Sequence, residues 1–297
     1  MLLTGGQFLV NGSVRIAKRL GTSPLLIGLT LVAFGTSAPE LAVSIKASLA
    51  GLPGISIGNV IGSNIANLLV ILGFTALLCP IPVSNKILRQ DSIVMLAVSA
   101  LFVVASLFLP LSRLVGGIYV LLLAIYIIYG WWNDKKEAAP EVEEVVVIRD
   151  GIYTSLVLVF AGLTLLAVGG NFLVNGASGI ARLFGISETV IGLTIVAIGT
   201  SAPELVTSIV AAVRKEPDIA LGNVVGSNIY NILGIAGITG IIAPTIIPVD
   251  IILDNWIMLG TTVLAIIFFW RGHRLVRHEG VLLLLLYVGY ICWLLQR

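Results

Sequence analysis

The sequence predicts an all-α membrane protein with about ten transmembrane helices, arranged as two inverted five-helix repeats whose central helices are broken. Three observations lead to this prediction: an apolar composition, a series of membrane-length segments and an internal repeat. Hydrophobic residues make up 58% of the 297 positions and charged residues only 11%, whereas a soluble domain has roughly 25% charged residues. A mean hydropathy of +1.09 therefore indicates that the surface of the protein faces a lipid bilayer. The net charge of +2 is too small to favour nucleic-acid binding.

Apolar segments follow one another along the whole chain. A helix needs roughly 20 apolar residues to cross about 30 Å of hydrocarbon, and nine segments have about this length. They lie at 24–50, 55–79, 92–110, 114–132, 152–177, 187–212, 217–243, 251–270 and 280–295, with a shorter one at 1–17. Four of the nine contain clusters of Gly, Pro, Ser, Thr and Asn, so we expect these four to be broken helices.

An internal repeat defines the two halves. GTSPLLIGLTLVAFGTSAPELAVSI from Gly21 matches GISETVIGLTIVAIGTSAPELVTSI from Gly185, and SIGNVIGSNIANLLVILG from Ser56 matches ALGNVVGSNIYNILGIAG from Ala220. The offset is 164 residues throughout, and 33 of the 60 positions from 21 to 80 are identical to their partners. Two such halves are typical of membrane transporters. The expected units are a first repeat at 1–132, a charged cytoplasmic loop at 133–150 and a second repeat at 151–297.

The basic residues predict the orientation of the repeats. An odd number of spans in each repeat inverts the second relative to the first. With ten spans and both ends outside, the inner loops hold thirteen of the 17 basic residues, as the positive-inside rule requires of a multi-pass protein of the cell membrane. The inner set is Arg15, Lys18, Arg19, Lys86, Arg89, Lys135, Lys136, Arg149, Arg214, Lys215, Arg271, Arg274 and Arg277, and the outer set is Lys46, Arg113, Arg182 and Arg297.

The first span is shorter than its counterpart. About 17 largely apolar residues precede GGNFLVNG at Gly169, whereas only MLLT precedes the matching GGQFLVNG at Gly5. The difference corresponds to roughly three helical turns. We expect the native protein to begin about a dozen apolar residues further upstream; the alternative is that the short span is genuine.

Two acidic residues stand apart from the other thirteen. Of fifteen acidic residues, only Glu40 and Glu204 lie deep within apolar segments. A carboxylate at the centre of a bilayer costs several kcal/mol unless it is paired or faces a cavity, and no Lys or Arg lies at comparable depth in either motif. Two protonated glutamates in the core are the alternative, but the repeated placement favours a cation site.

The neighbours of both glutamates supply further oxygen atoms. Each glutamate follows Gly-Thr-Ser-Ala-Pro, and proline frees a carbonyl one turn earlier, so we expect the carbonyls near Thr36 and Thr200 to face the site. Hydroxyls and amides of both motifs add neutral oxygens. The candidates are Ser37, Ser63, Asn67, Ser201, Ser227 and Asn231. The glycines at 58, 62, 222 and 226 are explained at least as well by close helix packing.

The predicted ligand set contains only oxygen. The absence of His and Cys from both motifs argues against Zn²⁺ or Cu⁺, whereas Ca²⁺ takes roughly 6–8 oxygens in flexible geometry. Two carboxylates balance one divalent cation or two monovalent ones, so the residues alone do not identify the transported pair. No cofactor is expected.

The paired GTSAPE and GNxxGSNIxN motifs resemble the α-repeats of the cation/Ca²⁺ exchanger superfamily, and most closely those of prokaryotic Na⁺/Ca²⁺ exchangers. The resemblance implies ten helices with the α-repeats in a central four-helix core, and a secondary antiporter that exchanges Na⁺ for Ca²⁺ by alternating access at a midplane site. By the family pattern, Glu40, Glu204 and the carbonyls of Thr36 and Thr200 hold Ca²⁺. Sodium sites use the two glutamates together with Ser37, Ser63, Ala197, Thr200, Ser201 and Ser227, and Asn67 and Asn231 line the centre.

One position departs from the pattern of close prokaryotic relatives. Residue 231 is Asn, where those relatives and the K⁺-dependent branch often have Asp. In having Asn at this position the sequence resembles the K⁺-independent animal exchangers, so we expect transport without K⁺.

Three other functions compete with this interpretation. An H⁺/Ca²⁺ antiporter would use Glu40 and Glu204 as proton acceptors, although the many hydroxyl oxygens favour Na⁺. A passive channel would show flux without a counter-ion, whereas repeated broken helices favour alternating access. An enzyme is not expected, because the sequence has no HExxH motif and no nucleophile–base set.

Overall fold

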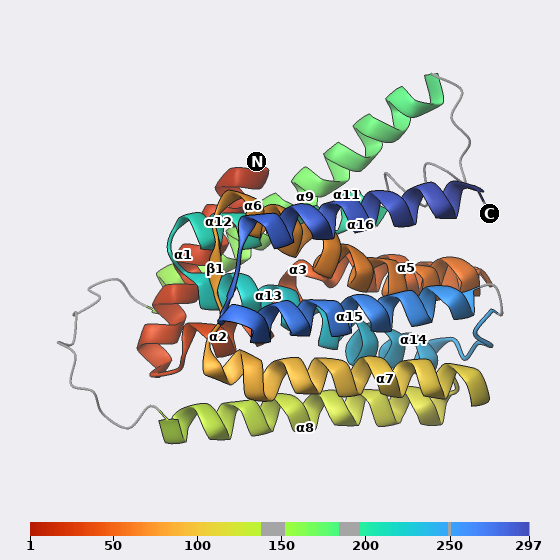
Figure 1. The fold of residues 1–297 in the computed structure, drawn as a ribbon, viewed down its shortest axis with the longest axis horizontal. Coiled ribbons are helices and arrows are strands. Elements are labelled where there is room, and N and C mark those ends of the chain that lie inside the picture. Colours follow the sequence, from red (N-terminus) through yellow and green to blue (C-terminus); the bar gives the residue numbers. More distant parts are fainter. Residues whose placement is uncertain (138–151, 184–196, 249–250, 297) are drawn as a thin grey trace.

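Long helices lie side by side along one direction in the computed structural model (Figure 1), which describes residues 1–137, 152–183, 197–248 and 251–296. In the element names, η marks a turn with π-helical hydrogen bonding. The first half contains α1 (Leu2–Leu20), α2 (Pro24–Ile27), η1 (Gly28–Val32), α3 (Ala33–Thr36), α4 (Ala38–Leu49), α5 (Pro53–Ala66), η2 (Asn67–Ile71), α6 (Leu72–Leu78), β1 (Ile81–Pro82), η3 (Ile87–Asp91), α7 (Ser92–Phe108) and α8 (Arg113–Glu137). The second half contains α9 (Ile152–Leu183), α11 (Ala197–Thr200), α12 (Ala202–Val213), α13 (Pro217–Tyr230), η5 (Asn231–Ala236), α14 (Gly237–Ile242), α15 (Ile252–Gly272), β2 (Arg274–Leu275) and α16 (Arg277–Gln296).

The helices are those of a multi-pass membrane protein. Among the described residues, seven helices are long and apolar enough to cross a membrane, and one bent pair adds an eighth candidate. Burial separates them into two classes: the spans Pro53–Leu78 and Pro217–Ile242 are each 83% buried, whereas Arg113–Asp134 and Arg277–Leu294 are each 17% buried. The two repeat motifs therefore form the core, and the later helices of each half surround it. The count of ten spans stays a prediction.

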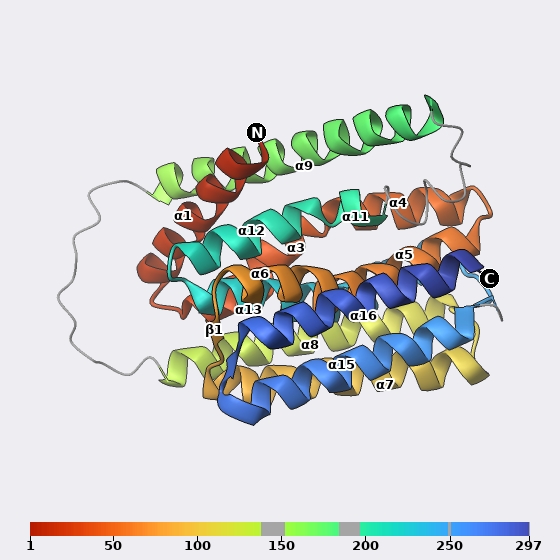
Figure 2. The ribbon, with the colours of Figure 1, turned by 45° about the horizontal axis from the view of Figure 1, so that its top comes forward.

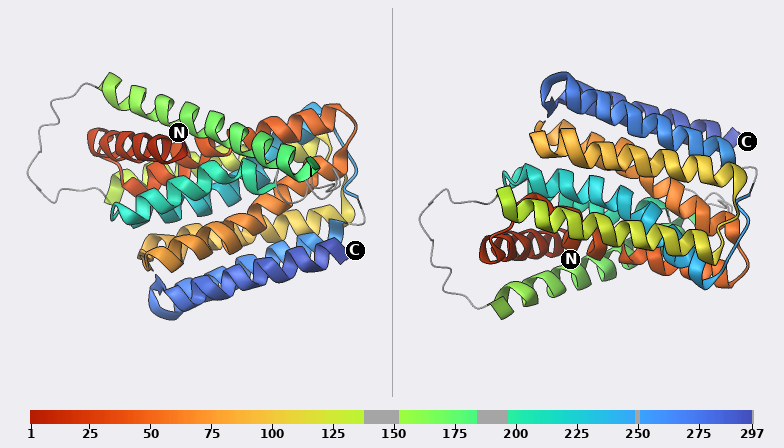
Figure 3. Two further views of the ribbon diagram at one scale, coloured as in Figure 1. Left: turned by 90° about the horizontal axis from the view of Figure 1, so that it is seen from above. Right: turned by 90° about the horizontal axis from the view of Figure 1, so that it is seen from below.

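The order of elements recurs with the offset of the sequence repeat. Helices α4 and α12 have 12 residues each, and α5 and α13 have 14 residues each. Figure 2 shows that α4 meets α5 at the end of the molecule where the C terminus lies, whereas α12 meets α13 at the opposite end. Helices α1 and α9 are the equivalent first helices of the two halves, but α1 has 19 residues and α9 has 32. They pack against each other along one side of the molecule (Figure 3).

Contacts between the halves also occur in exchanged pairs. Ile81 pairs with Leu275 in the two-stranded β1–β2 ribbon, and Thr245 forms a bridge with Leu111. Adding 164 to 81 gives 245, and adding it to 111 gives 275, so these two pairings are the same contact with the halves interchanged.

Four glycines repeat this exchange inside the helix layers. A Cβ on Gly280 of α16 would lie 2.6 Å from the carbonyl oxygen of Gly73 in α6. In the same way, a Cβ on Gly116 of α8 would overlap the carbonyl oxygen of Gly237 in α14. These helices therefore approach backbone to backbone, as small residues permit in membranes. The interchange links each half to the other rather than leaving two separate bundles.

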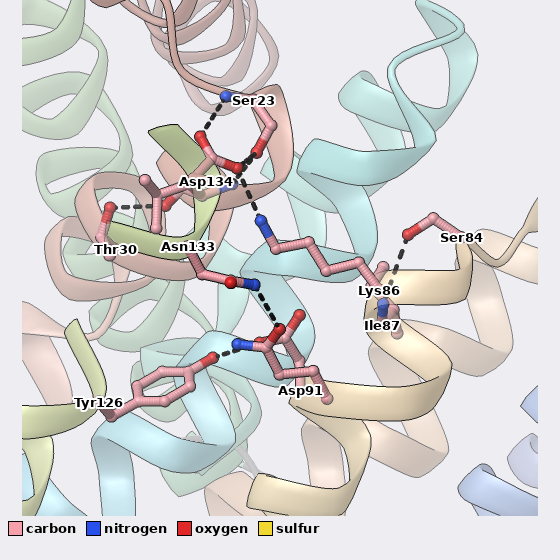
Figure 4. A network of polar contacts seen from close by, with 11 residues as sticks. Ser23, Thr30, Ser84, Lys86, Ile87, Asp91, Tyr126, Asn133 and Asp134 are labelled. Atoms are coloured by element: carbon pink, nitrogen blue, oxygen red, sulfur yellow. Dashed lines mark hydrogen bonds and ion pairs between the residues drawn. The ribbon is translucent and has the colours of Figure 1, made fainter. Parts of the chain in front are cut away.

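A polar network joins three elements at the end of the molecule that contains β1, the end of α1 and the end of α8. Asp134 of α8 is 3% exposed; it accepts hydrogen bonds from the backbone N–H and the hydroxyl of Ser23, at 2.7 and 2.5 Å, and forms an ion pair of 2.7 Å with Lys86 (Figure 4). Ser23 in turn caps α2 by accepting from the N–H of Leu26.

We call this end of the molecule the basic end, because the basic residues expected on the inner side gather there. The elements at this end are the last part of α1, with Arg15, Lys18 and Arg19, the turn from α12 to α13, with Arg214 and Lys215, and the β1–β2 ribbon, with Arg274 in β2 and Lys86 shortly after β1.

Candidate ion-binding site

Glu40 and Glu204 occupy equivalent places at two helix breaks. Glu40 lies in the first turn of α4 and Glu204 in the first turn of α12, and each residue is 1% exposed. The helices break at Ser37 and Ser201, whose backbone angles are nearly identical (φ −84° and ψ 7°; φ −85° and ψ 6°). In the first half the bend between the two parts is 44°. The GTSAP motif therefore interrupts a helix twice, as its proline predicts.

The two breaks contact each other through exchanged hydrogen bonds. The Ser37 hydroxyl donates to Glu204 Oε1 at 2.8 Å, and the Ser201 hydroxyl donates to Glu40 Oε1 at 3.1 Å. Ser37 Oγ also lies 3.2 Å from Ser227 Oγ. Each carboxylate is thus held by the serine of the opposite half, and the two motifs converge on one buried region.

Four further oxygens of this region lack a hydrogen-bond donor among the described residues. Glu40 Oε2 and Glu204 Oε2 have no hydrogen-bond partner in the described part of the chain, and neither have Asn67 Oδ1 and Asn231 Oδ1. All four residues are 1% exposed. Buried polar atoms are nearly always paired, and a group of unpaired acceptors that includes two carboxylates is electrostatically suited to a cation.

Two asparagines that sequence reasoning did not single out position the glutamates. Asn59 Nδ2 donates to the Glu40 carbonyl at 3.0 Å and to Ser44 Oγ at 2.8 Å. Asn223 Nδ2 makes the equivalent bonds to the Glu204 carbonyl at 3.2 Å and to Ser208 Oγ at 2.9 Å. Each asparagine therefore fastens a broken helix to the next helix. The signal was present in the sequence, since both residues belong to the repeated Gly-Asn-Val of the second motif.

A π-helical turn begins at each of the two central asparagines. Turn η2 begins at Asn67 and turn η5 at Asn231, and π-helical turns inside α-helices are frequent at functional sites. Ser63 and Ser227 lie one turn earlier and are 3% and 0% exposed. The structure thus places both residue pairs of the second motif in the buried interior.

The other predicted residues fall into two groups. Thr36 is buried, and its hydroxyl lies 3.0 Å from the Val32 carbonyl and 3.1 Å from Asn223 Oδ1. Thr200 is half-buried at the end of α11, which begins at Ala197. Ligation by the carbonyls of Thr36 and Thr200 and by Ala197 stays a prediction.

The glycines of the second motif pack closely against the first half. A Cβ on Gly226 would lie 2.6 Å from the Leu29 carbonyl oxygen, and one on Gly222 would lie 2.9 Å from that of Leu25. These two glycines therefore permit close packing, which confirms the packing interpretation for them. For Gly58 and Gly62 the packing interpretation stays a prediction.

Comparison with known proteins agrees with this geometry. The family model described as sodium/calcium exchanger protein matches residues 1–132 and 154–296. The chain belongs to the sodium/calcium exchanger family. This is a family of membrane transporters.

Several relatives match almost the whole exchanger. The putative antiporter CaxA of Alkalimonas amylolytica is 36% identical, and the sodium/calcium exchanger MaX1 of Methanosarcina acetivorans is 34% identical; each match covers 98% of this chain and 94% of the relative. The solved structure of the sodium-calcium exchanger NCX_Mj soaked with Na⁺ and Ca²⁺ is 34% identical and superposes with a TM-score of 0.85, covering 98% of this chain and 94% of that one. The fold of the exchanger is therefore that of NCX_Mj.

Proposed function

We propose that the exchanger carries Na⁺ and Ca²⁺ in opposite directions across the cell membrane, by alternating access at a site built by Glu40 and Glu204. The observation that supports this most strongly is the exchanged pairing of Ser37 with Glu204 and Ser201 with Glu40. It brings the only two acids that lie deep in the repeat motifs to one buried region that both halves share.

The chemistry of the site favours Ca²⁺ and Na⁺ as alternative occupants. The proposed Ca²⁺ ligands are Glu40, Glu204 and the carbonyls of Thr36 and Thr200, and two carboxylates balance one Ca²⁺ in a medium where net charge is costly. The proposed Na⁺ sites add the oxygens of Ser37, Ser63, Ala197, Thr200, Ser201 and Ser227, with Asn67 and Asn231 lining the centre. Because both ions need the same carboxylates, they exclude each other, and exclusion is what an exchange cycle requires.

The arrangement of the helices supports two inverted repeats. The α4–α5 turn and the α12–α13 turn lie at opposite ends of the molecule (Figure 2). The Ile81–Leu275 and Thr245–Leu111 pairs are one contact with the halves interchanged. A two-fold axis in the membrane plane relates such halves in transporters, and it lets the same site open to either side.

An exchange of counter-ions in proteoliposomes tests the proposal. Vesicles loaded with Na⁺ should take up Ca²⁺ from a Na⁺-free medium with the pH clamped on both sides, and uptake should stop when the outward Na⁺ gradient is removed. Because position 231 is Asn, uptake should proceed with no K⁺ present. Uptake driven by a pH gradient alone would instead identify an H⁺/Ca²⁺ antiporter, and Ca²⁺ entry without any counter-ion would identify a channel.

A further inference from the structure

A cavity of about 340 Å³ lies at the basic end, between α1 and the turn that joins α12 to α13. It is separate from the glutamate site, which occupies the first turns of α4 and α12. Its lining residues are Val10, Asn11, Val14, Arg15, Arg214 and Glu216.

The charge of this cavity suits an anion. Two of its walls contribute a guanidinium, from Arg15 and from Arg214, and Arg214 donates a hydrogen bond to Asn11. Lys18 and Arg19 occupy the last turn of α1, and Lys215 lies in the adjoining turn with a φ of 63°. Burial raises the pKa of the Glu216 carboxyl, and the nearby Lys18 lowers it. Arg15 and Arg214 outnumber Glu216 in the lining, and Glu216 is influenced by one further base, Lys18, and one further acid, Asp218. With all five groups ionised the net charge is +1, which suits an anion better than the cations that the exchanger transports.

The walls also indicate which kind of anion fits. Val10 and Val14 lie one turn apart on α1 and form an apolar side of the cavity, toward the membrane-spanning part of the helix. A charged rim above an apolar wall matches a phospholipid, whose phosphate sits at the membrane surface and whose acyl chain runs along the protein. Arginine binds phosphate oxygens in two-pronged geometry.

We propose that this cavity binds the phosphate group of an anionic glycerophospholipid. The lipid bridges Arg15 on α1 and Arg214 at the end of α12, the helix whose first turn contains Glu204. The inference does not depend on which ions are exchanged.

Lipid binding by the full-length exchanger in detergent tests the proposal. Native mass spectrometry should show retained phosphatidylglycerol in preference to phosphatidylcholine, and the double variant Arg15→Gln/Arg214→Gln should lower that affinity by roughly tenfold or more for each guanidinium removed. The control is Arg113→Gln, an exposed arginine that begins α8 at the opposite end, and it should leave lipid binding unchanged.

A second variant guards against a folding defect. Val14→Trp fills the cavity and keeps every charge, so it should also displace phosphatidylglycerol while Arg113→Gln does not. Unchanged lipid retention in both cavity variants would overturn the proposal. Displacement of the retained lipid by inorganic phosphate, together with equal retention of phosphatidylglycerol and phosphatidylcholine, would contradict the lipid assignment. It would identify a site for free phosphate.

Discussion

Ser37 and Ser201 each hold one oxygen of a carboxylate that belongs to the opposite half. The second oxygen of each carboxylate remains without a donor in the described part of the chain. The serine hydrogen bond orients each carboxylate and so determines where its second oxygen points. A serine hydroxyl suits the task because it donates one hydrogen bond and still offers lone pairs to an ion.

The serine contacts lead to a prediction at the residue scale. Ser37→Ala and Ser201→Ala should each weaken Ca²⁺ binding by roughly tenfold, because a hydrogen bond to a charged group contributes about 1.5–3 kcal/mol. Calorimetric titration of the purified exchanger with Ca²⁺ measures this directly. Ser48→Ala is the matched control, since the Ser48 hydroxyl bonds to Ser56 Oγ at 2.8 Å further along α4. Full Ca²⁺ affinity in both site variants would show that these serines do not orient the carboxylates.

At the scale of elements, the attachment of broken helices to their neighbours determines the shape of the site. Asn59 and Asn223 fasten α4 to α5 and α12 to α13 near the glutamates. At the basic end, Asp134 holds the start of α2 and the Lys86 side chain next to α8. The segment that leads into Ser37 is therefore anchored at its start as well as at its break.

The Asp134 network gives a prediction about stability. Asp134→Asn should destabilise the exchanger by about 1.5–3 kcal/mol, because it removes the charge of a carboxylate that pairs with Lys86 and accepts two hydrogen bonds from Ser23. Thermal or chemical unfolding in detergent measures the loss. The double variant Lys86→Met/Asp134→Asn should be less destabilised than the sum of the single variants, since both single variants lose the same ion pair. Strictly additive losses would mean that the ion pair does not contribute as a pair.

At the scale of the whole molecule, the sequence predicts more of the chemistry than of the contacts. The burial of Glu40 and Glu204 could be predicted, because an acid in an apolar segment is costly unless it is accommodated and the same placement recurs after 164 residues. The breaks followed from Pro39 and Pro203. The partner of each serine could not be predicted, because the contact crosses from one half to the other and depends on how the halves pack.

Other features were equally hidden for physical reasons. The repeated Gly-Asn-Val motif contains Asn59, but the hydrogen bond of this residue to the Glu40 carbonyl of the preceding helix could not be predicted from the local sequence. Asp134 stands at the end of an apolar segment, where an acid normally meets water, and only the fold brings Ser23 and Lys86 to it. Such roles belong to tertiary structure and not to the local pattern.

The most direct test of the central claim removes the charge of one glutamate at a time. In Na⁺-loaded proteoliposomes, Glu40→Gln and Glu204→Gln should each abolish Ca²⁺ uptake while the protein remains inserted, because either change leaves one charge of a bound Ca²⁺ uncompensated in a low-dielectric site. The control Glu279→Gln keeps an oxygen that can accept from the Val276 N–H at the start of α16, and it should exchange normally. Exchange near the wild-type rate in both site variants would contradict the account.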